Sequence, residues 1–216
     1  MYRAQRNYEN LNRAIYVGEG PFDFPRIEPE TLIRADRVIG FNYAKTCKDP
    51  ENTGVHFFID DYQFSRLWTN PDAYLELLRR FKFVFTPDFS MYTDFPKAVQ
   101  IFNAYRNHWL GAYWQENDIR VIPTVLWSDE SSFEWCFSGD PVGGVVAVSS
   151  VGTQMHKESR EIFLRGYNEM LQRLAPKAVY FYGAVPKECE GNIIKIAAFQ
   201  ESLRKRADKS PSRREA

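Results

Sequence analysis

Residues 83–127 read FVFTPDFSMYTDFPKAVQIFNAYRNHWLGAYWQENDIRVIPTVLW, and the fold class follows from this stretch. It begins with a short apolar run at residues 83–86. Between residues 96 and 113, apolar residues recur three and four positions apart, and a second apolar run occupies residues 120–127. The two runs predict strands, and the spacing between them predicts a helix. A strand, a helix and a second strand in this order indicate a βαβ unit with parallel strands.

The same alternation extends in both directions along the chain. Apolar runs predict further strands at residues 38–43, 55–59, 145–149 and 178–182, apolar spacing predicts helices at 74–81 and 156–174, and residues 193–203 predict a last short strand or helix. The runs are continuously apolar, which is typical of parallel strands buried on both faces. We therefore predict an α/β fold of alternating β/α units with a mostly parallel sheet. It is arranged as a compact or incomplete TIM-like barrel or, alternatively, as an open doubly wound sheet.

Length and composition fit one globular domain with extensions at both ends. In the 216-residue chain we predict an extended N-terminal lead-in at residues 1–37, a single α/β domain at 38–200, and a basic, disordered tail at 201–216. The net charge of zero argues against a protein that coats DNA. No apolar stretch approaches the roughly 20 residues of a membrane span, so we expect no membrane partner. Three cysteines are too few for a disulfide framework, which favours the cytoplasm.

Aspartates follow three of the predicted strands. In parallel α/β folds, ligands bind at the carboxyl ends of the strands, so the residues just after each strand are the first candidates for a site. We predict that Asp60, Asp88 and Asp129 are catalytic. We also predict that Asp60, Asp61 and Asp88 bind Mg²⁺ or Mn²⁺, because these ions prefer oxygen ligands. The competing interpretation is that these aspartates cap the helices that follow them.

Aromatic, hydroxyl and cationic side chains near the same strand ends form a second candidate set. They are suited to stacking on a base or sugar and to contacting phosphate. The predicted substrate-binding residues are Tyr92, Arg106, Trp127, Ser149, Ser150 and Tyr182. Of the histidines, we expect His56 to be packed inside a strand and His108 to lie on the surface. The sequence contains no motif for zinc, nicotinamide, flavin or haem.

Three motifs carry a resemblance to a known family: FFIDDYQF at residues 57–64, TPDFSMYTD at 86–94 and VIPTVLWSD at 121–129. The chain resembles an uncharacterised domain-of-unknown-function family found in phages and mobile elements of Gram-positive bacteria. The resemblance runs from about Gly20 to Tyr182. It implies no established activity. Such an origin favours work on nucleic acids, nucleotides or host defence, which is an association and not a mechanism.

Several functions fit these residues. The leading hypothesis is a metal-dependent hydrolase that acts on a phosphodiester in nucleic acid or a nucleotide. One alternative is a non-catalytic binder of a small phosphorylated ligand or of a host protein. Another is a DNA replication or transfer accessory whose basic tail touches DNA. A glycosidase also stays open, because paired carboxylates on an aromatic-lined rim suit sugar chemistry.

Overall fold

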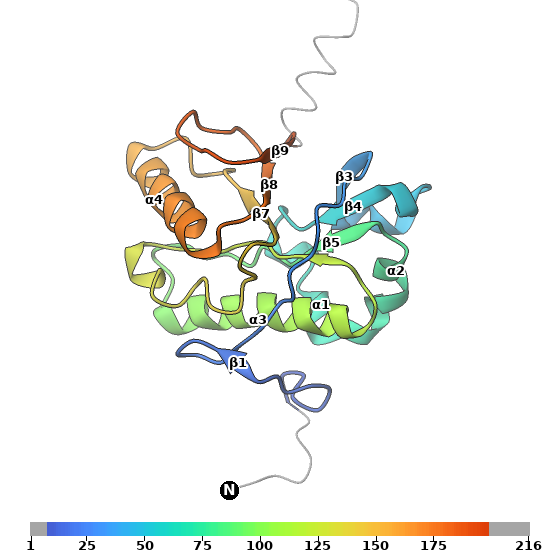
Figure 1. Cartoon of the computed structure of the whole chain (residues 1–216). Helices are drawn as coiled ribbons and strands as arrows, with labels where there is room; N and C mark the ends of the chain where they lie inside the picture. Colours follow the sequence, from blue (N-terminus) through green and yellow to red (C-terminus); the bar gives the residue numbers. More distant parts are fainter. Residues whose placement is uncertain (1–7, 199–216) are drawn as a thin grey trace, which may run out of the picture.

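The computed structural model describes residues 8–198 (Figure 1). Its strands are β1 (Gly18–Glu19), β2 (Phe24–Pro25), β3 (Arg37–Gly40), β4 (Thr53–His56), β5 (Phe83–Phe85), β6 (Val121–Ile122), β7 (Val145–Ser149), β8 (Ala178–Tyr182) and β9 (Ile193–Ile196). The α-helices are α1 (Arg66–Thr69), α2 (Leu75–Arg79), α3 (Lys97–Glu116) and α4 (Lys157–Leu174). Short 3-10 helices include η1 (Phe41–Thr46), η3 (Asp61–Gln63), η4 (Pro71–Tyr74) and η5 (Glu130–Ser132). The alternating α/β pattern is therefore confirmed, whereas the tail predicted at 201–216 lies outside the described residues.

Strands β3 to β9 are parallel, and each lies beside its neighbour in the sequence. One sheet has the order β3-β4-β5-β6 and the other has the order β7-β8-β9. A parallel bridge between Thr124 and Ala147 joins the two sheets. Val125 donates its N–H to the Ala147 carbonyl oxygen at 2.9 Å there. The strand order shows no reversal, so it lacks the switch point of the doubly wound alternative.

Alternate residues along each strand enter different cores. Val84, Val146 and Val179 point toward the helices, whereas Phe85 and Ala147 belong to an inner cluster. This inner cluster takes side chains from both sheets: Phe83, Phe85, Ile122, Val145, Ala147, Ala178, Tyr180 and Tyr182. Side chains alternate across a strand, so the two sheets share one interior face and present their other faces to the helices.

The two sheets do not close into a barrel. Within residues 8–198, β3 pairs only with β4 and β9 pairs only with β8. A TIM barrel has eight strands joined all the way round. The TIM-like barrel is therefore not confirmed, and the architecture is best described as parallel α/β sheets around a shared inner cluster.

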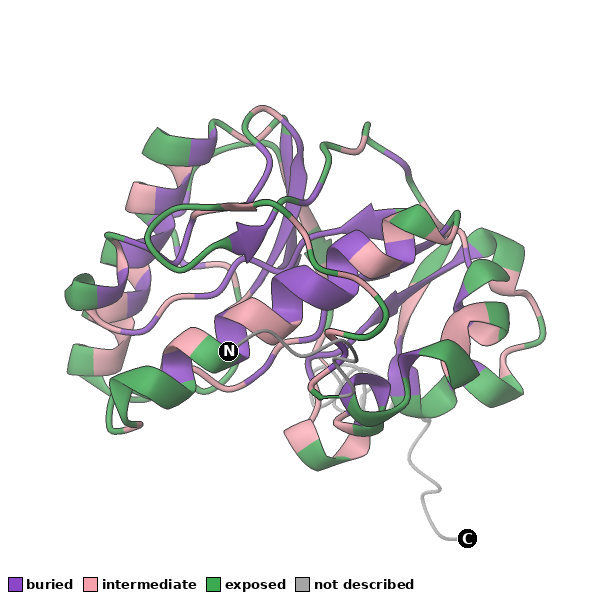
Figure 2. Cartoon of the chain, turned by 90° about the horizontal axis from the view of Figure 1, so that it is seen from below, coloured by how far each residue is buried: buried purple, intermediate pink, exposed green. Residues whose placement is uncertain are grey.

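Helix α3 buries a polar face that its apolar spacing does not predict. Val99 and Phe102 are exposed, whereas Gln100, Asn103 and Asn107 are buried. Figure 2 shows buried residues along much of this helix. The expected surface position of His108 is wrong as well. Its ring is 2% exposed, stacks on Phe24 and lies 3.4 Å from Asp140.

Residues 8–36, here called the N-terminal strap, run across α3 before entering β3 (Figure 1). The indole N–H of Trp109 donates to the Ala14 carbonyl oxygen at 3.2 Å. The Gln115 side-chain amide exchanges two hydrogen bonds with the Glu28 backbone. These bonds fix the strap against one side of the helix, so α3 is enclosed between the strap and the sheet.

Candidate functional site

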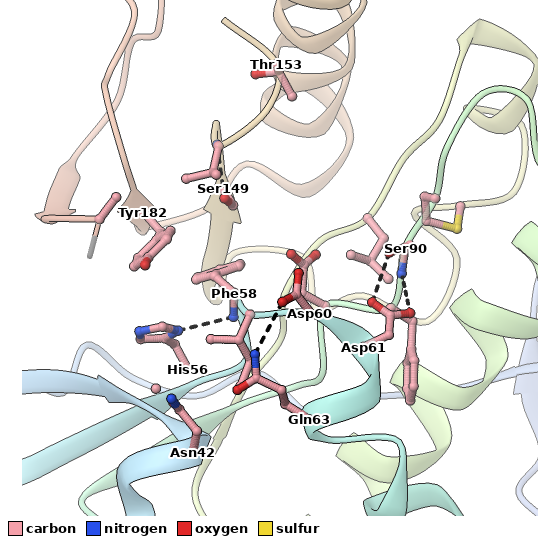
Figure 3. Close-up of a pocket in the computed structure, with 18 of the residues that line it drawn as sticks. Asn42, His56, Phe58, Asp60, Asp61, Gln63, Ser90, Ser149, Thr153 and Tyr182 are labelled. Atoms are coloured by element: carbon pink, nitrogen blue, oxygen red, sulfur yellow. Dashed lines mark hydrogen bonds between the residues drawn. The ribbon is translucent and has the colours of Figure 1, made fainter. Parts of the chain in front are cut away.

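A cavity of about 1310 Å³ opens at the carboxyl ends of the parallel strands (Figure 3). Its wall takes Asn42 from the segment after β3, His56 from β4, Asp88 from the segment after β5, Ser149 from β7 and Tyr182 from β8. Parallel strands end at one edge of their sheet, and their connections converge there. This is the edge where parallel α/β proteins bind ligands.

The structure brings together seven of the ten predicted site residues. The residues that line the cavity are Asp60, Asp61, Asp88, Tyr92, Trp127, Ser149 and Tyr182. Three predicted residues, Arg106, Asp129 and Ser150, do not line it. Asp129 caps η5, where its carboxylate accepts the Ser131 backbone N–H at 3.0 Å. The Ser131 hydroxyl bond and other contacts lower the pKa of Asp129. Ser150 donates its hydroxyl to the Ala184 carbonyl oxygen at 2.6 Å.

Asp88 and Asp61 form an electrostatic pair in the cavity wall. The Asp61 carboxylate accepts two hydrogen bonds from Ser90, from the backbone N–H at 3.1 Å and from the hydroxyl at 2.9 Å. Burial and the neighbouring Asp61 charge raise the pKa of Asp88 to about 7. A like charge and a low-polarity environment both favour the protonated form of a carboxyl group. The site thus holds a carboxyl group with a raised pKa, Asp88, beside a carboxylate that Ser90 hydrogen-bonds.

Helix α3 supports this pair from behind through Arg106 and Asn103. Arg106 donates to the Asn103 side-chain oxygen, and Asn103 donates its amide to the Ser90 carbonyl oxygen at 2.7 Å. The Arg106 guanidinium also lies 3.9 Å from the centre of the Phe89 ring. Burial lowers the pKa of Arg106, and the Asp61 charge opposes that change. Arg106 therefore holds the segment that carries Ser90, where the sequence had suggested a direct substrate contact.

His56 lines the cavity as a neutral imidazole. Its Nδ1 accepts the Phe58 backbone N–H at 3.1 Å, which places the ring proton on Nε2 (Figure 3). The centre of the His56 ring lies 4.6 Å from the centre of the Tyr182 ring. Burial lowers the pKa of His56 to about 4. At neutral pH this histidine is therefore a hydrogen-bond donor and not a cation.

The predicted metal ligands lie in one cavity wall without forming a compact cluster. Asp60, Asp61 and Asp88 line the same cavity. Yet residues 8–198 contain no group of three or more histidine, cysteine, aspartate or glutamate side chains placed to hold one ion. Asp60 instead accepts a hydrogen bond from Gln63 at 3.4 Å. Binding of Mg²⁺ or Mn²⁺ by these residues therefore stays a prediction.

Polar lining residues outside the predicted site set include Asn42, His56, Gln63, Ser90 and Thr153. Asn42 lies at the end of a predicted strand and Gln63 follows another, so the strand-end rule points to both. His56 lies inside β4, where a packed ring and a site residue look the same in a sequence. Within the described part of the chain, the lining contains neither lysine nor arginine. The wall is thus acidic and aromatic.

Within residues 8–198, no helix is both long enough and apolar enough to cross a membrane.

Comparison with known proteins places the chain in a family. The chain is 41% identical to the "Gene 1 protein" of Mycobacterium phage L5 over 186 residues, 85% of this chain and 80% of that protein. It is 34% identical to the "Gene 1 protein" of Mycobacterium phage D29 over 179 residues, 82% of this chain and 66% of that protein. No solved structure matches it. A family model described as a domain of unknown function, DUF4417, matches residues 16–200, and the chain belongs to this phage-associated family.

Proposed function

We propose that the protein is a hydrolase that works by acid–base catalysis with Asp88 and Asp61. The observation that carries the proposal is the pKa of Asp88, which burial and Asp61 raise to about 7 in a cavity at the strand ends. Pairs of carboxyl groups in different environments often divide the acid and base roles. A general acid works best when its pKa lies near the working pH.

Each group has a defined task in this reaction. Protonated Asp88 gives its proton to the leaving oxygen as the bond between that oxygen and the electrophilic atom breaks. A water molecule bonds to the electrophilic atom, and the Asp61 carboxylate takes up the proton that the water loses. Transfer of this proton to Asp88 through solvent restores the starting state. Ser90 keeps Asp61 oriented, because it donates two hydrogen bonds to that carboxylate.

A phosphodiester substrate is the second candidate, and it has a different requirement. Tyr92 and Trp127 line the cavity and can stack on a base. However, Asp60 and Asp61 line the same wall beside Asp88, without a lysine or arginine among the described residues, so a phosphate would be repelled. This reaction therefore needs a divalent cation such as Mg²⁺ or Mn²⁺ to offset the charge. The non-catalytic alternative is a protein that binds a nucleotide, a host protein or DNA without turning it over. We also propose that the protein works in the cytoplasm.

The test is hydrolysis of a panel of nitrophenyl glycosides, phosphomonoesters, phosphodiesters and carboxylic esters, with EDTA or with added Mg²⁺ or Mn²⁺. We expect turnover in EDTA that falls at least about 100-fold in Asp88→Asn and in Asp61→Asn. The matched control is Asp36→Asn, because Asp36 is exposed and precedes β3 at the opposite end of the strand. We also expect the rate to fall as the pH rises through about 7, since Asp88 must be protonated.

Three results would contradict the proposal. Turnover that survives in Asp88→Asn would remove Asp88 from the reaction. Turnover of phosphodiesters that appears only with Mg²⁺ or Mn²⁺ would support the metal-dependent candidate. Saturable binding of a panel compound with no turnover under any condition would favour the non-catalytic alternative.

A further inference from the structure

Three exposed tyrosines stand at the mouth of the cavity. Tyr43 is 49% exposed, Tyr62 is 77% exposed and Tyr92 is 63% exposed, and all three line the cavity. Large aromatic side chains usually bury most of their surface, so an exposed ring needs a reason. Exposed aromatic residues gathered at one site mark a binding surface.

The tyrosines lie in three adjacent connections. Tyr43 follows β3 in η1, Tyr62 follows β4 in η3, and Tyr92 follows β5. Strands β3, β4 and β5 are neighbours in one parallel sheet, and neighbouring strands lie about 4.8 Å apart. The three connections therefore leave the sheet in this order, and each contributes one tyrosine to the lining of the cavity. We call Tyr43, Tyr62 and Tyr92 the tyrosine row.

Two of the tyrosines have polar chain neighbours in the cavity wall. Asn42 precedes Tyr43, and Asp61 precedes Tyr62 with Gln63 after it. Figure 3 shows Asn42, His56, Asp60 and Gln63 around the same opening. Amide, carboxylate and imidazole groups together can both donate hydrogen bonds to hydroxyl groups and accept them. The wall thus pairs flat apolar rings with hydroxyl-binding groups.

Charge and size narrow the class of ligand. Among the described residues, the lining includes three aspartates and neither lysine nor arginine, so a polyanion is repelled. The cavity of about 1310 Å³ is larger than the roughly 300–1,000 Å³ of a typical small-molecule pocket. A neutral ligand of several linked, hydroxyl-bearing rings matches the charge, the volume and the row of aromatic side chains.

We propose that the cavity binds a neutral oligosaccharide, whose successive sugar rings pack on Tyr43, Tyr62 and Tyr92. Asn42 and Gln63 bind its hydroxyl groups. Binding of the oligosaccharide does not depend on the proposed function. Only its cleavage rests on that function, in which Asp88 and Asp61 would act on a glycosidic bond of the bound sugar. Binding stands on the tyrosine row and the lining alone.

The test measures binding before cleavage. Neutral oligosaccharides of glucose, xylose, mannose, galactose, arabinose and N-acetylglucosamine, from one to six units long, are titrated into the full chain by calorimetry. Thymidine, a dT hexamer and a heparin hexasaccharide are the comparison ligands. We expect affinity for at least one neutral series to rise with length. We expect Tyr62→Ala and Tyr92→Ala each to weaken it by roughly two- to tenfold, in line with the strength of aromatic contacts.

Matched variants separate stacking from a general loss of structure. Tyr62→Phe and Tyr92→Phe keep the rings and should bind nearly as well as the wild type. Tyr8→Ala removes a tyrosine that is 70% exposed and does not line the cavity, so it should leave binding unchanged.

The outcomes distinguish this proposal from the catalytic one. No binding by any neutral series, tighter binding of the dT hexamer or heparin, or equal binding by Tyr62→Ala and Tyr92→Ala would overturn the oligosaccharide proposal. Affinity for thymidine that matches that of the longest saccharide would overturn it too, in favour of a nucleoside. Length-dependent saccharide binding without hydrolysis would support it while contradicting catalysis by Asp88 and Asp61.

Discussion

Asp88 illustrates how an ordinary residue acquires a special chemistry from its neighbours. Its position after β5 places it in the cavity wall, and burial beside Asp61 raises its pKa to about 7. Asp129 follows the next strand but accepts hydrogen bonds from Ser131, and its pKa is lowered. The same residue type thus serves as a candidate acid at one strand end and as a helix cap at the next.

The raised pKa of Asp88 has a consequence for stability. The folded chain holds the Asp88 proton up to about pH 7, whereas the unfolded chain releases it near 3.8. The folded state therefore binds more protons between these values, and Asp88 makes the free energy of unfolding fall as the pH rises through this window. We expect Asp88→Asn to lose this part of the pH dependence and to exceed the wild type in stability at about pH 8.

Urea unfolding of both proteins at about pH 5 and about pH 8 checks this prediction. Asp36→Asn is the control, since Asp36 is exposed and outside the cavity lining. A wild-type pH dependence that persists unchanged in Asp88→Asn would show that Asp88 does not hold its proton in the folded chain.

At the scale of the element, α3 acts as a support for the segment that carries Asp88. Gln100 donates its side-chain amide to the carbonyl oxygens of Tyr92 and Phe95, and Asn107 donates to that of Pro87 at 2.9 Å. Asn103 lies between them on the helix and bonds Ser90. These three amides satisfy the backbone of residues 87–95 without any regular secondary structure there.

Removing one of these amides should loosen the segment. Asn103→Ala leaves the partly buried Ser90 carbonyl oxygen and the Arg106 guanidinium without their Asn103 partner, so we expect a loss of about 1–3 kcal/mol in the free energy of unfolding. We also expect faster hydrogen exchange at residues 88–92. Asn168→Ala, an exposed amide on α4, should change stability by less than about 0.5 kcal/mol. Equal effects of the two variants would contradict a supporting role for Asn103.

A glycine on α4 controls the position of Trp127. A Cβ atom at Gly166 would lie 2.2 Å from the Trp127 indole nitrogen, closer than atoms can pack. An alanine is normally the better helix former by about 1 kcal/mol. We nevertheless expect Gly166→Ala to destabilise the protein and to displace Trp127, because the clash outweighs the propensity. A shifted Trp127 indole signal in NMR spectra would report the movement, and an unshifted signal would contradict it. Asn168→Ala on the same helix is the control.

The elements also show what a sequence can and cannot reveal. The spacing of apolar residues and the lengths of the apolar runs correctly predicted α4 and the strands from β3 to β8, because burial of apolar side chains stabilises those elements. The face of α3 was unpredictable, since Gln100, Asn103 and Asn107 look like surface residues until their backbone partners are known. The residues that follow the predicted strands include most of the predicted residues that line the cavity. Whether an aspartate there becomes a cap or a buried acid depends on partners such as Ser131 and Asp61, which strand order alone does not give.

At the scale of the whole molecule, the N-terminal strap connects the separate cores. Phe24 belongs to the core beneath α4, Ile27 to the core between α3 and the first sheet, and Ile33 to the inner cluster shared by the two sheets. The Tyr180 hydroxyl also donates to the Ile33 carbonyl oxygen. One segment thus packs into all three cores, although the sequence indicated only an extended lead-in.

This arrangement makes the strap part of the cooperative unit. Phe24 and Ile27 are fully buried, so we expect Phe24→Ala and Ile27→Ala to lower the free energy of unfolding by about 2–5 kcal/mol each. Leu32→Ala is the control, because Leu32 is 40% exposed and should cost much less. Chemical unfolding followed by tryptophan fluorescence and by far-ultraviolet circular dichroism measures both the loss and its cooperativity. Since the strap joins all three cores, both signals should shift together in one transition. Two separate transitions in the wild type, or a strap variant no less stable than Leu32→Ala, would mean that the cores fold independently of the strap.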